Sequence, residues 1–170
     1  MTLPERYKAL IITLSDRAAA GDYDDLSGPK VKEMIDNYFK EIGWSLESEV
    51  VIIPDDVSKL RYLINESSRE YNILITTGGT GIGPNDITVG VVKELIEIEI
   101  PGIMELIRVK YGMEKPNALL SRSVAGIMGK SLVYTLPGSV KAVTEYMSEI
   151  LKTLQHSIYM QYGVDVHLKH

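Results

Sequence analysis

Cysteine is absent from this chain of 170 residues, and histidine occurs only as His156, His167 and His170. Without cysteine the chain can form neither a disulfide framework nor a thiolate zinc site. The histidines all fall within the last fifteen residues, which we interpret as a solvated tail apart from every candidate motif. A covalent mechanism through a thiol or an imidazole is therefore not expected.

Long hydrophobic runs are also missing. No apolar run approaches the ~18 residues that a membrane span needs. The amino terminus does not show a basic segment followed by an apolar one, which is the pattern of a secretory signal. These absences predict a cytoplasmic protein without a membrane partner.

Basic residues are too few and too scattered for a nucleic-acid surface. Lysine and arginine total 18 against 23 acidic residues, the net charge is −5, and no basic cluster is longer than a pair. Neutralising a nucleic-acid backbone needs a basic face, so no nucleic-acid partner is predicted. A small anionic ligand remains compatible with this charge, because helix N-termini and a few well-placed cations can make a site locally positive.

Apolar content and its periodicity indicate the fold. With 45% apolar residues the chain can bury one core, and we expect a single domain over residues 1–170. The alternation of strands and helices predicts an α/β, three-layer domain with a mostly parallel sheet and helices on both faces. We predict strands over 7–14, 45–53 and 71–76, helices over 28–42 (with Ser27 as N-cap), 57–70, 88–97, 101–111 and 140–161, and a β-hairpin over 121–136.

The most informative segment is the glycine-rich loop of residues 76–86, Thr-Thr-Gly-Gly-Thr-Gly-Ile-Gly-Pro-Asn-Asp, which follows the third predicted strand. Glycines let a ligand approach the main chain, and bare N–H groups suit a phosphate and its metal. The alternative is a flexible turn, although such turns rarely use four glycines. Asp86 ends the loop, where it can either cap the next helix or hold Mg²⁺ against phosphate oxygens.

Two nucleotide-binding motifs are excluded by their spacing. The pattern G-x-G-x-x-G fails because Pro84 stands three residues after Gly81. Residues 129–131, Gly-Lys-Ser, look like the end of a Walker A loop, but Val124 stands where that motif needs its first glycine. Strand-like residues then follow where the motif needs a helix, so we predict a hairpin turn at this point.

Polar residues follow the other predicted strands as well. Asp16 and Asp25 lie after the first strand, and Asp55 and Asp56 follow the second. Each acid taken alone also suits a helix cap or a turn. Because the carboxyl ends of parallel strands meet at one edge of a sheet, we expect these acids to converge with the glycine loop. Residues 136–139, Leu-Pro-Gly-Ser, open the last helix and can offer N–H groups to a second anion.

Seven short motifs occur in order along the chain. They are Thr-Leu-Ser-Asp-Arg (13–17), Ser-Gly (27–28), Ile-Pro-Asp-Asp (53–56), Thr-Thr-Gly-Gly-Thr-Gly…Asp-Ile-Thr (76–88), Pro-Gly…Glu-Leu-Ile-Arg (101–108), Leu-Leu-Ser-Arg (119–122) and Leu-Pro-Gly-Ser (136–139). In this order and spacing, the chain from about residue 7 to 155 resembles the MoaB/Mog family of molybdenum-cofactor biosynthesis proteins. The resemblance implies a three-layer α/β fold and a homo-oligomer, either a trimer or a hexamer.

Enzymatic members of that family are molybdopterin adenylyltransferases. The resemblance therefore implies transfer of AMP from the co-substrate ATP, with Mg²⁺, to the terminal phosphate of molybdopterin, and release of pyrophosphate. It implies Asp55 and Asp86 as catalytic acids that also bind the metal, and a substrate pocket formed by Ser15, Asp16, Gly78, Gly79, Thr80, Gly81, Pro137, Gly138 and Ser139.

Two other functions stay open on the sequence. One is a non-catalytic molybdopterin-binding or scaffold protein of the same fold, and the other is hydrolysis of a nucleotide pyrophosphate bond. Two acids beside an anionic ligand favour the transferase, because a pure binding protein would gain little from them. The chain departs from the family pattern at Asp56 and at residues 82–85, and the resemblance assigns no role to either.

Overall fold

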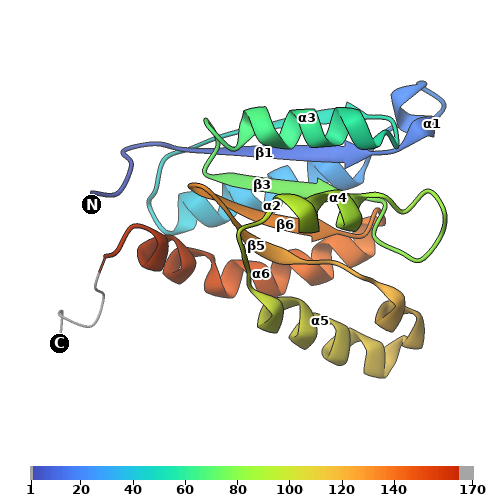
Figure 1. The fold of residues 1–170 in the computed structure, drawn as a ribbon. Coiled ribbons are helices and arrows are strands. Elements are labelled where there is room, and N and C mark those ends of the chain that lie inside the picture. Colours follow the sequence, from blue (N-terminus) through green and yellow to red (C-terminus); the bar gives the residue numbers. More distant parts are fainter. Residues whose placement is uncertain (1, 165–170) are drawn as a thin grey trace.

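A six-stranded sheet forms the centre of the computed structural model, which describes residues 2–164 (Figure 1). The strands are β1 (Tyr7–Leu14), β2 (Leu46–Ile53), β3 (Ile73–Thr77), β4 (Ile98–Glu99), β5 (Ala125–Met128) and β6 (Ser131–Leu136). Their order across the sheet is β2-β1-β3-β6-β5-β4. The pairs β1–β2, β1–β3 and β3–β6 are parallel, whereas β4–β5 and β5–β6 are antiparallel. The predicted mostly parallel sheet and its hairpin are confirmed.

Helices cover both faces of this sheet, which confirms the three-layer α/β prediction (Figure 1). One apolar core contains residues of α2, α5 and α6, and a second contains residues of α3 and α4. The helices are α1 (Asp16–Ala19), α2 (Ser27–Glu41), α3 (Val57–Ser67), α4 (Thr88–Leu95), α5 (Pro101–Glu114) and α6 (Val140–Gln161), with a 3₁₀ turn η1 (Pro116–Leu120).

Strand β1 contributes to both cores. Successive side chains of a strand point to opposite faces, so a strand covered on both sides has a continuous apolar sequence. This is why the apolar run of residues 7–14 indicates a central strand, which lies between β2 and β3. Its side chains facing α2 and α6 are Tyr7, Ala9 and Ile11, and those facing α3 and α4 are Leu10, Ile12 and Leu14.

Several local predictions differ from the structure. The short elements α1, β4 and η1 lie outside the predicted strands and helices, because two to five residues are too few to show a periodicity. Ser27 is the first residue of α2 rather than its N-cap, and the Asp25 carboxylate accepts hydrogen bonds from the N–H groups of Ser27 (3.0 Å) and Gly28 (3.2 Å). His156 lies exposed on α6 and not in a tail, whereas His167 and His170 lie outside the described residues.

None of the helices within residues 2–164 combines the length and the apolar content of a membrane span.

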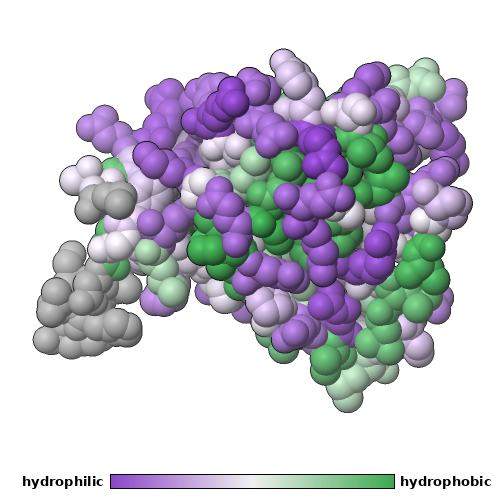
Figure 2. All heavy atoms as spheres, viewed as in Figure 1, coloured by the Kyte–Doolittle hydropathy of each residue, from purple (hydrophilic) through white to green (hydrophobic). Residues whose placement is uncertain are grey.

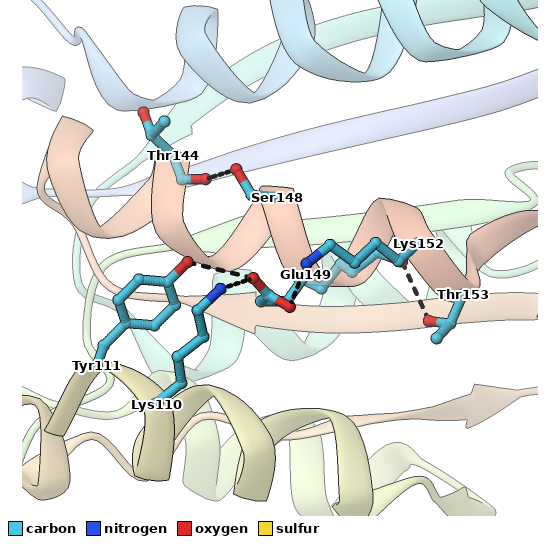
Figure 3. Close-up of polar contacts among 8 residues, drawn as sticks. Lys110, Tyr111, Thr144, Ser148, Glu149, Lys152 and Thr153 are labelled. Carbon is cyan, nitrogen blue, oxygen red and sulfur yellow. Dashed lines mark hydrogen bonds and ion pairs between the residues drawn. The ribbon is translucent and has the colours of Figure 1, made fainter. Parts of the chain in front are cut away.

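A buried carboxylate, Glu149, ties α5 to α6 (Figure 3). It accepts hydrogen bonds from Lys110 Nζ at 2.6 Å, from Lys152 Nζ at 2.8 Å and from the Tyr111 hydroxyl at 3.3 Å. The contacts with Lys110 and then with Lys152 hold the pKa of Glu149 below its usual value. This connection fixes α5, whose carboxyl end leads into η1.

We expect Glu149→Gln to destabilise the fold by about 1 kcal/mol at pH 7, since two ammonium groups lose their charged partner while water still reaches both. Because the folded-state pKa of Glu149 is lowered, its stabilising effect is present above the unfolded-state pKa and is lost as pH falls through the folded-state pKa. Urea unfolding at several pH values measures this difference. Glu105→Gln, at an exposed site on α5, should have little effect. Equal stabilities of the parent and Glu149→Gln at pH 7 would contradict the prediction.

Candidate functional site

The glycine-rich loop leaves the carboxyl end of β3, between the ends of β1 and β6. Gly78 and Gly79 have φ angles of +94° and +64°, which side chains rarely tolerate. The Gly78 N–H donates to the Leu136 carbonyl at 2.9 Å, and a Cβ on Gly78 would lie 2.5 Å from the Leu14 carbonyl oxygen. Backbone conformation and the closeness of both neighbouring strands therefore require glycine here.

Arg122 donates hydrogen bonds to carbonyl groups of the glycine-rich loop. Its Nε donates to the Gly81 carbonyl at 2.5 Å, and its Nη2 donates to the Asp86 carbonyl at 2.6 Å. The Arg122 backbone N–H also donates to the Thr80 carbonyl at 2.9 Å. Arg122 is exposed, and its position in the sequence does not predict these contacts. Its place in the Leu-Leu-Ser-Arg motif is the one sequence signal that sets it apart.

Thr88, at the start of α4, holds the other half of the loop. Its Oγ1 donates to the Gly78 carbonyl at 2.8 Å, and its N–H donates to the Gly79 carbonyl at 3.1 Å. The N–H groups of Gly79, Thr80 and Gly81 have no hydrogen-bond acceptor within residues 2–164. The carbonyl groups of the loop therefore accept hydrogen bonds from the protein, whereas its successive N–H groups are available to an anion.

A cleft of about 540 Å³ lies beside this loop. Helix α6 begins at the cleft, where Ser139 Oγ accepts a hydrogen bond from the Ala142 N–H at 3.2 Å as the N-cap. The first turn of a long helix favours negative charge. Lining residues come from the loop (Gly79, Thr80, Gly81, Asp86), from η1 and its flanks (Lys115, Asn117, Ala118, Leu120, Ser121) and from the start of α6 (Pro137, Gly138, Ser139, Lys141, Ala142, Glu145, Tyr146).

Most of the site residues predicted from sequence line this cleft. Gly78 lies behind it, close enough that a Cβ on Gly138 would stand 3.3 Å from the Gly78 Cα. Ser15, Asp16 and Asp55 do not line the cleft, but they follow β1 and β2 at the same edge of the sheet. Lys141 is one of the cations that the sequence places beside these loops, whereas Lys115 and Tyr146 were not found as site residues, because their contribution depends on how α5, η1 and α6 pack.

Asp16 and Asp55 are paired across the ends of β1 and β2. The Asp55 N–H donates to Asp16 Oδ1 at 2.9 Å, and the Asp16 N–H donates to Asp55 Oδ2 at 3.3 Å. Partial burial raises the pKa of Asp55, and the charges of Asp16 and Asp86 add to this effect. Asp56 has a different task, because it caps α3 by accepting a hydrogen bond from the Lys59 N–H at 2.8 Å.

Asp86 is held inside the loop. Its Oδ2 accepts a hydrogen bond from the Gly83 N–H at 2.7 Å, while its Oδ1 has no donor within the described part of the chain. Helix α4 begins after Ile87 without a side-chain cap, so the predicted N-cap role of Asp86 is wrong. The carboxylate thus keeps one oxygen for another ligand.

The carboxylates of Asp16, Asp55 and Asp86 are chemically suited to Mg²⁺, which prefers oxygen ligands. Within residues 2–164, no three acidic or histidine side chains gather closely enough to enclose an ion by themselves. This agrees with the usual magnesium site, in which one or two carboxylates bind and substrate phosphates and water complete the coordination. Burial is the main reason that the pKa of Asp55 is raised, and a cation would relieve the smaller contribution from the charges of Asp16 and Asp86.

A partly buried hydroxyl network lies beneath the site. Asp25 Oδ2 accepts from Thr13 Oγ1 at 2.6 Å, and Asp25 Oδ1 accepts from Ser27 Oγ at 2.9 Å. Thr77, the last residue of β3, has its Oγ1 3.3 Å from the hydroxyl oxygens of both Thr13 and Ser27. Asp25 is therefore an internal connector of β1, β3 and α2 rather than the surface turn residue that the sequence suggests.

The chain is similar to several known proteins in sequence and in fold. Residues 10–156 match the family described as a probable molybdopterin binding domain. Gephyrin of Dictyostelium discoideum is 36% identical over 155 residues, which cover 87% of this chain but 21% of that protein. Molybdopterin adenylyltransferase of Helicobacter pylori is 33% identical over 150 residues, or 87% of this chain and 84% of that protein. The crystal structure of the tungsten cofactor synthesizing protein MoaB from Pyrococcus furiosus has a TM-score of 0.81 and 30% identity, and the match covers 96% of this chain and 100% of that one.

Proposed function

This chain belongs to the MoaB/Mog family of molybdopterin-binding domains, and we propose that it is a molybdopterin adenylyltransferase of molybdenum-cofactor biosynthesis. The reaction transfers AMP from Mg-ATP to the terminal phosphate of molybdopterin and releases pyrophosphate. The observation that carries the proposal is the cleft, where backbone N–H donors without partners in the described chain stand beside the Asp86 carboxylate.

In this proposal the backbone does most of the binding. The N–H groups of Gly79, Thr80 and Gly81 bind phosphate oxygens and orient the pterin phosphate for in-line attack on the α-phosphorus of ATP. Asp86 and Asp55 would hold Mg²⁺, and a bound Mg²⁺ would supply positive charge beside the phosphate oxygens. Charge neutralisation and positioning suffice for this reaction, and no side chain acts as a covalent nucleophile.

Hydrogen bonds that fix the conformation of the glycine-rich loop support its phosphate-binding role. Arg122 and Thr88 donate hydrogen bonds to the loop carbonyls and so fix the direction of the neighbouring N–H groups. Donors that are already oriented do not have to reorganise when charge develops during the reaction, and such donors are the main source of electrostatic catalysis.

A direct test is incubation of the purified chain with molybdopterin, ATP and Mg²⁺. We expect adenylylated molybdopterin and pyrophosphate in equal amounts, measured by chromatography and mass spectrometry. Binding of molybdopterin without either product would instead support the alternative, a non-catalytic binding or scaffold protein.

Oligomerisation to a trimer or a hexamer is part of the same proposal. Figure 2 shows apolar atoms gathered over the edge where α5 and η1 lie in Figure 1. Exposed apolar side chains on a soluble surface of this kind often mark an interface. They are Leu106 and Val109, 56% and 58% exposed, Met113, 84% exposed, and Leu119 and Leu120, 55% and 52% exposed.

We expect a sedimentation mass that is a multiple of three chains, and dissociation on Met113→Glu, which places a charge on this face. Met160→Glu, at a similarly exposed methionine on α6, serves as the control and should leave the assembly intact. A monomeric or dimeric parent chain at micromolar concentration would contradict the prediction.

A further inference from the structure

Two lysines from different elements meet in the same cleft as the glycine loop. Lys115 lies between α5 and η1, and Lys141 lies in the first turn of α6. Lys115 Nζ donates to Glu145 Oε1 at 2.9 Å. Lys141 Nζ has no hydrogen bond or ion pair with an acidic group within residues 2–164. The ammonium group of Lys115 is close enough to lower the pKa of Lys141.

This arrangement is electrostatically unfavourable in the free protein. Lys115 is paired with Glu145, whereas within the described residues Lys141 forms no ion pair. Glu114 and Glu145 act on Lys141 only through their charges. Lys141 also stands at the positive end of the α6 dipole, where a cation is disfavoured. Other lysines of this chain, such as Lys32 beside Asp36, have a carboxylate of their own. Local electrostatic conflict of this kind is expected where a site awaits a ligand of opposite charge.

We propose that Lys115 and Lys141 form a second anion subsite, which binds a phosphate group other than the one at the glycine loop. The inference rests on the proposed function, in which two phosphate-bearing substrates, ATP and molybdopterin, share one cleft. A cleft of about 540 Å³ has room for more than a single phosphate group. Each ammonium group offers three donors and a compact charge, which suits phosphate oxygens.

The carboxylate of Glu145 opposes anion binding at this subsite. This carboxylate accepts a hydrogen bond from Lys115 and so competes with the anion for that ammonium group. Removing the Glu145 charge should therefore strengthen anion binding, whereas removing either lysine should weaken it. If these side chains only supported the fold, their substitutions would not change anion affinity in opposite directions.

The test is calorimetric titration of inorganic pyrophosphate, with Mg²⁺ and at fixed ionic strength, into the parent and its variants. We expect Lys115→Met and Lys141→Met each to weaken binding by about tenfold, and Glu145→Gln to strengthen it by about threefold. Lys130→Met, at the exposed tip of the β5–β6 hairpin, should bind like the parent. Circular dichroism and thermal unfolding establish that every variant is folded.

Separate titrations of ATP and of molybdopterin identify the source of the phosphate group. A loss of affinity for ATP alone supports a nucleotide phosphate at the subsite, and a loss for molybdopterin alone supports the pterin phosphate. Unchanged affinity of both lysine variants for pyrophosphate and for both substrates overturns the subsite, even if the parent chain adenylylates molybdopterin. If the parent makes no adenylylated product but both lysine variants lose pyrophosphate affinity, the subsite stands and the proposed function fails.

Discussion

Asp86→Asn is expected to lower the rate of adenylyl transfer by roughly 10²-fold or more, which corresponds to about 3 kcal/mol of transition-state stabilisation. Asparagine keeps the shape of the side chain, and its carbonyl oxygen can still accept the hydrogen bond that the Gly83 N–H now gives to Asp86 Oδ2. The loop should therefore keep its conformation, and molybdopterin binding should be largely retained. What disappears is the negative charge that a magnesium ion requires.

The measurement is kcat/KM for the transfer over a range of Mg²⁺ concentrations. Asp56→Asn is the matched control, because Asp56 caps α3 and asparagine is an equally good cap. Asp55→Asn should lose activity as Asp86→Asn does. Rescue by Asp56 is not expected, since that side chain is engaged with the Lys59 N–H. If Asp86→Asn turned over at the parent rate, the metal-binding assignment would fail and the binding-protein alternative would be favoured.

Gly79→Ala is expected to weaken binding of a phosphate-bearing ligand by tenfold or more and to lower stability by about 1–2 kcal/mol. The φ angle of Gly79 is +64°, and a Cβ there would lie 2.4 Å from Thr88 Oγ1. Thr88 must then move, and its hydrogen bonds to the carbonyls of Gly78 and Gly79 must change. The N–H donors of the loop lose their orientation as a result.

Calorimetric titration of pyrophosphate and thermal unfolding measure these two effects. Gly90→Ala is the matched control, because Gly90 lies exposed within α4 and a Cβ there would meet no atom within 4 Å. This control should bind like the parent and be slightly more stable, since alanine favours a helix. Parent-like affinity in folded Gly79→Ala would remove the phosphate-binding role from this loop.

The sequence by itself determined the architecture and where the candidate site residues lie along the chain. The strand over residues 7–14 follows from its continuous apolar run, and the helix over 140–161 follows from its helical periodicity, which depends only on which side of the helix each residue faces. The glycine loop is equally local, because the positive φ angles of Gly78 and Gly79 are accessible mainly to glycine. Parallel pairing then brings the loops after β1, β2 and β3 to one edge.

Only the tertiary structure decided how individual side chains are used. Arg122 binds the carbonyl of Gly81, 41 positions away along the chain, and Asp16 pairs with Asp55 across 39 positions. Asp86 bonds to Gly83 rather than capping α4, and Lys115 meets Lys141 because α5 packs beside α6. Hydrophobic periodicity and residue propensity predict the local structure of a segment from its own residues in an average environment. The partner of a polar side chain instead depends on ångström-scale packing between distant elements, which no local pattern contains.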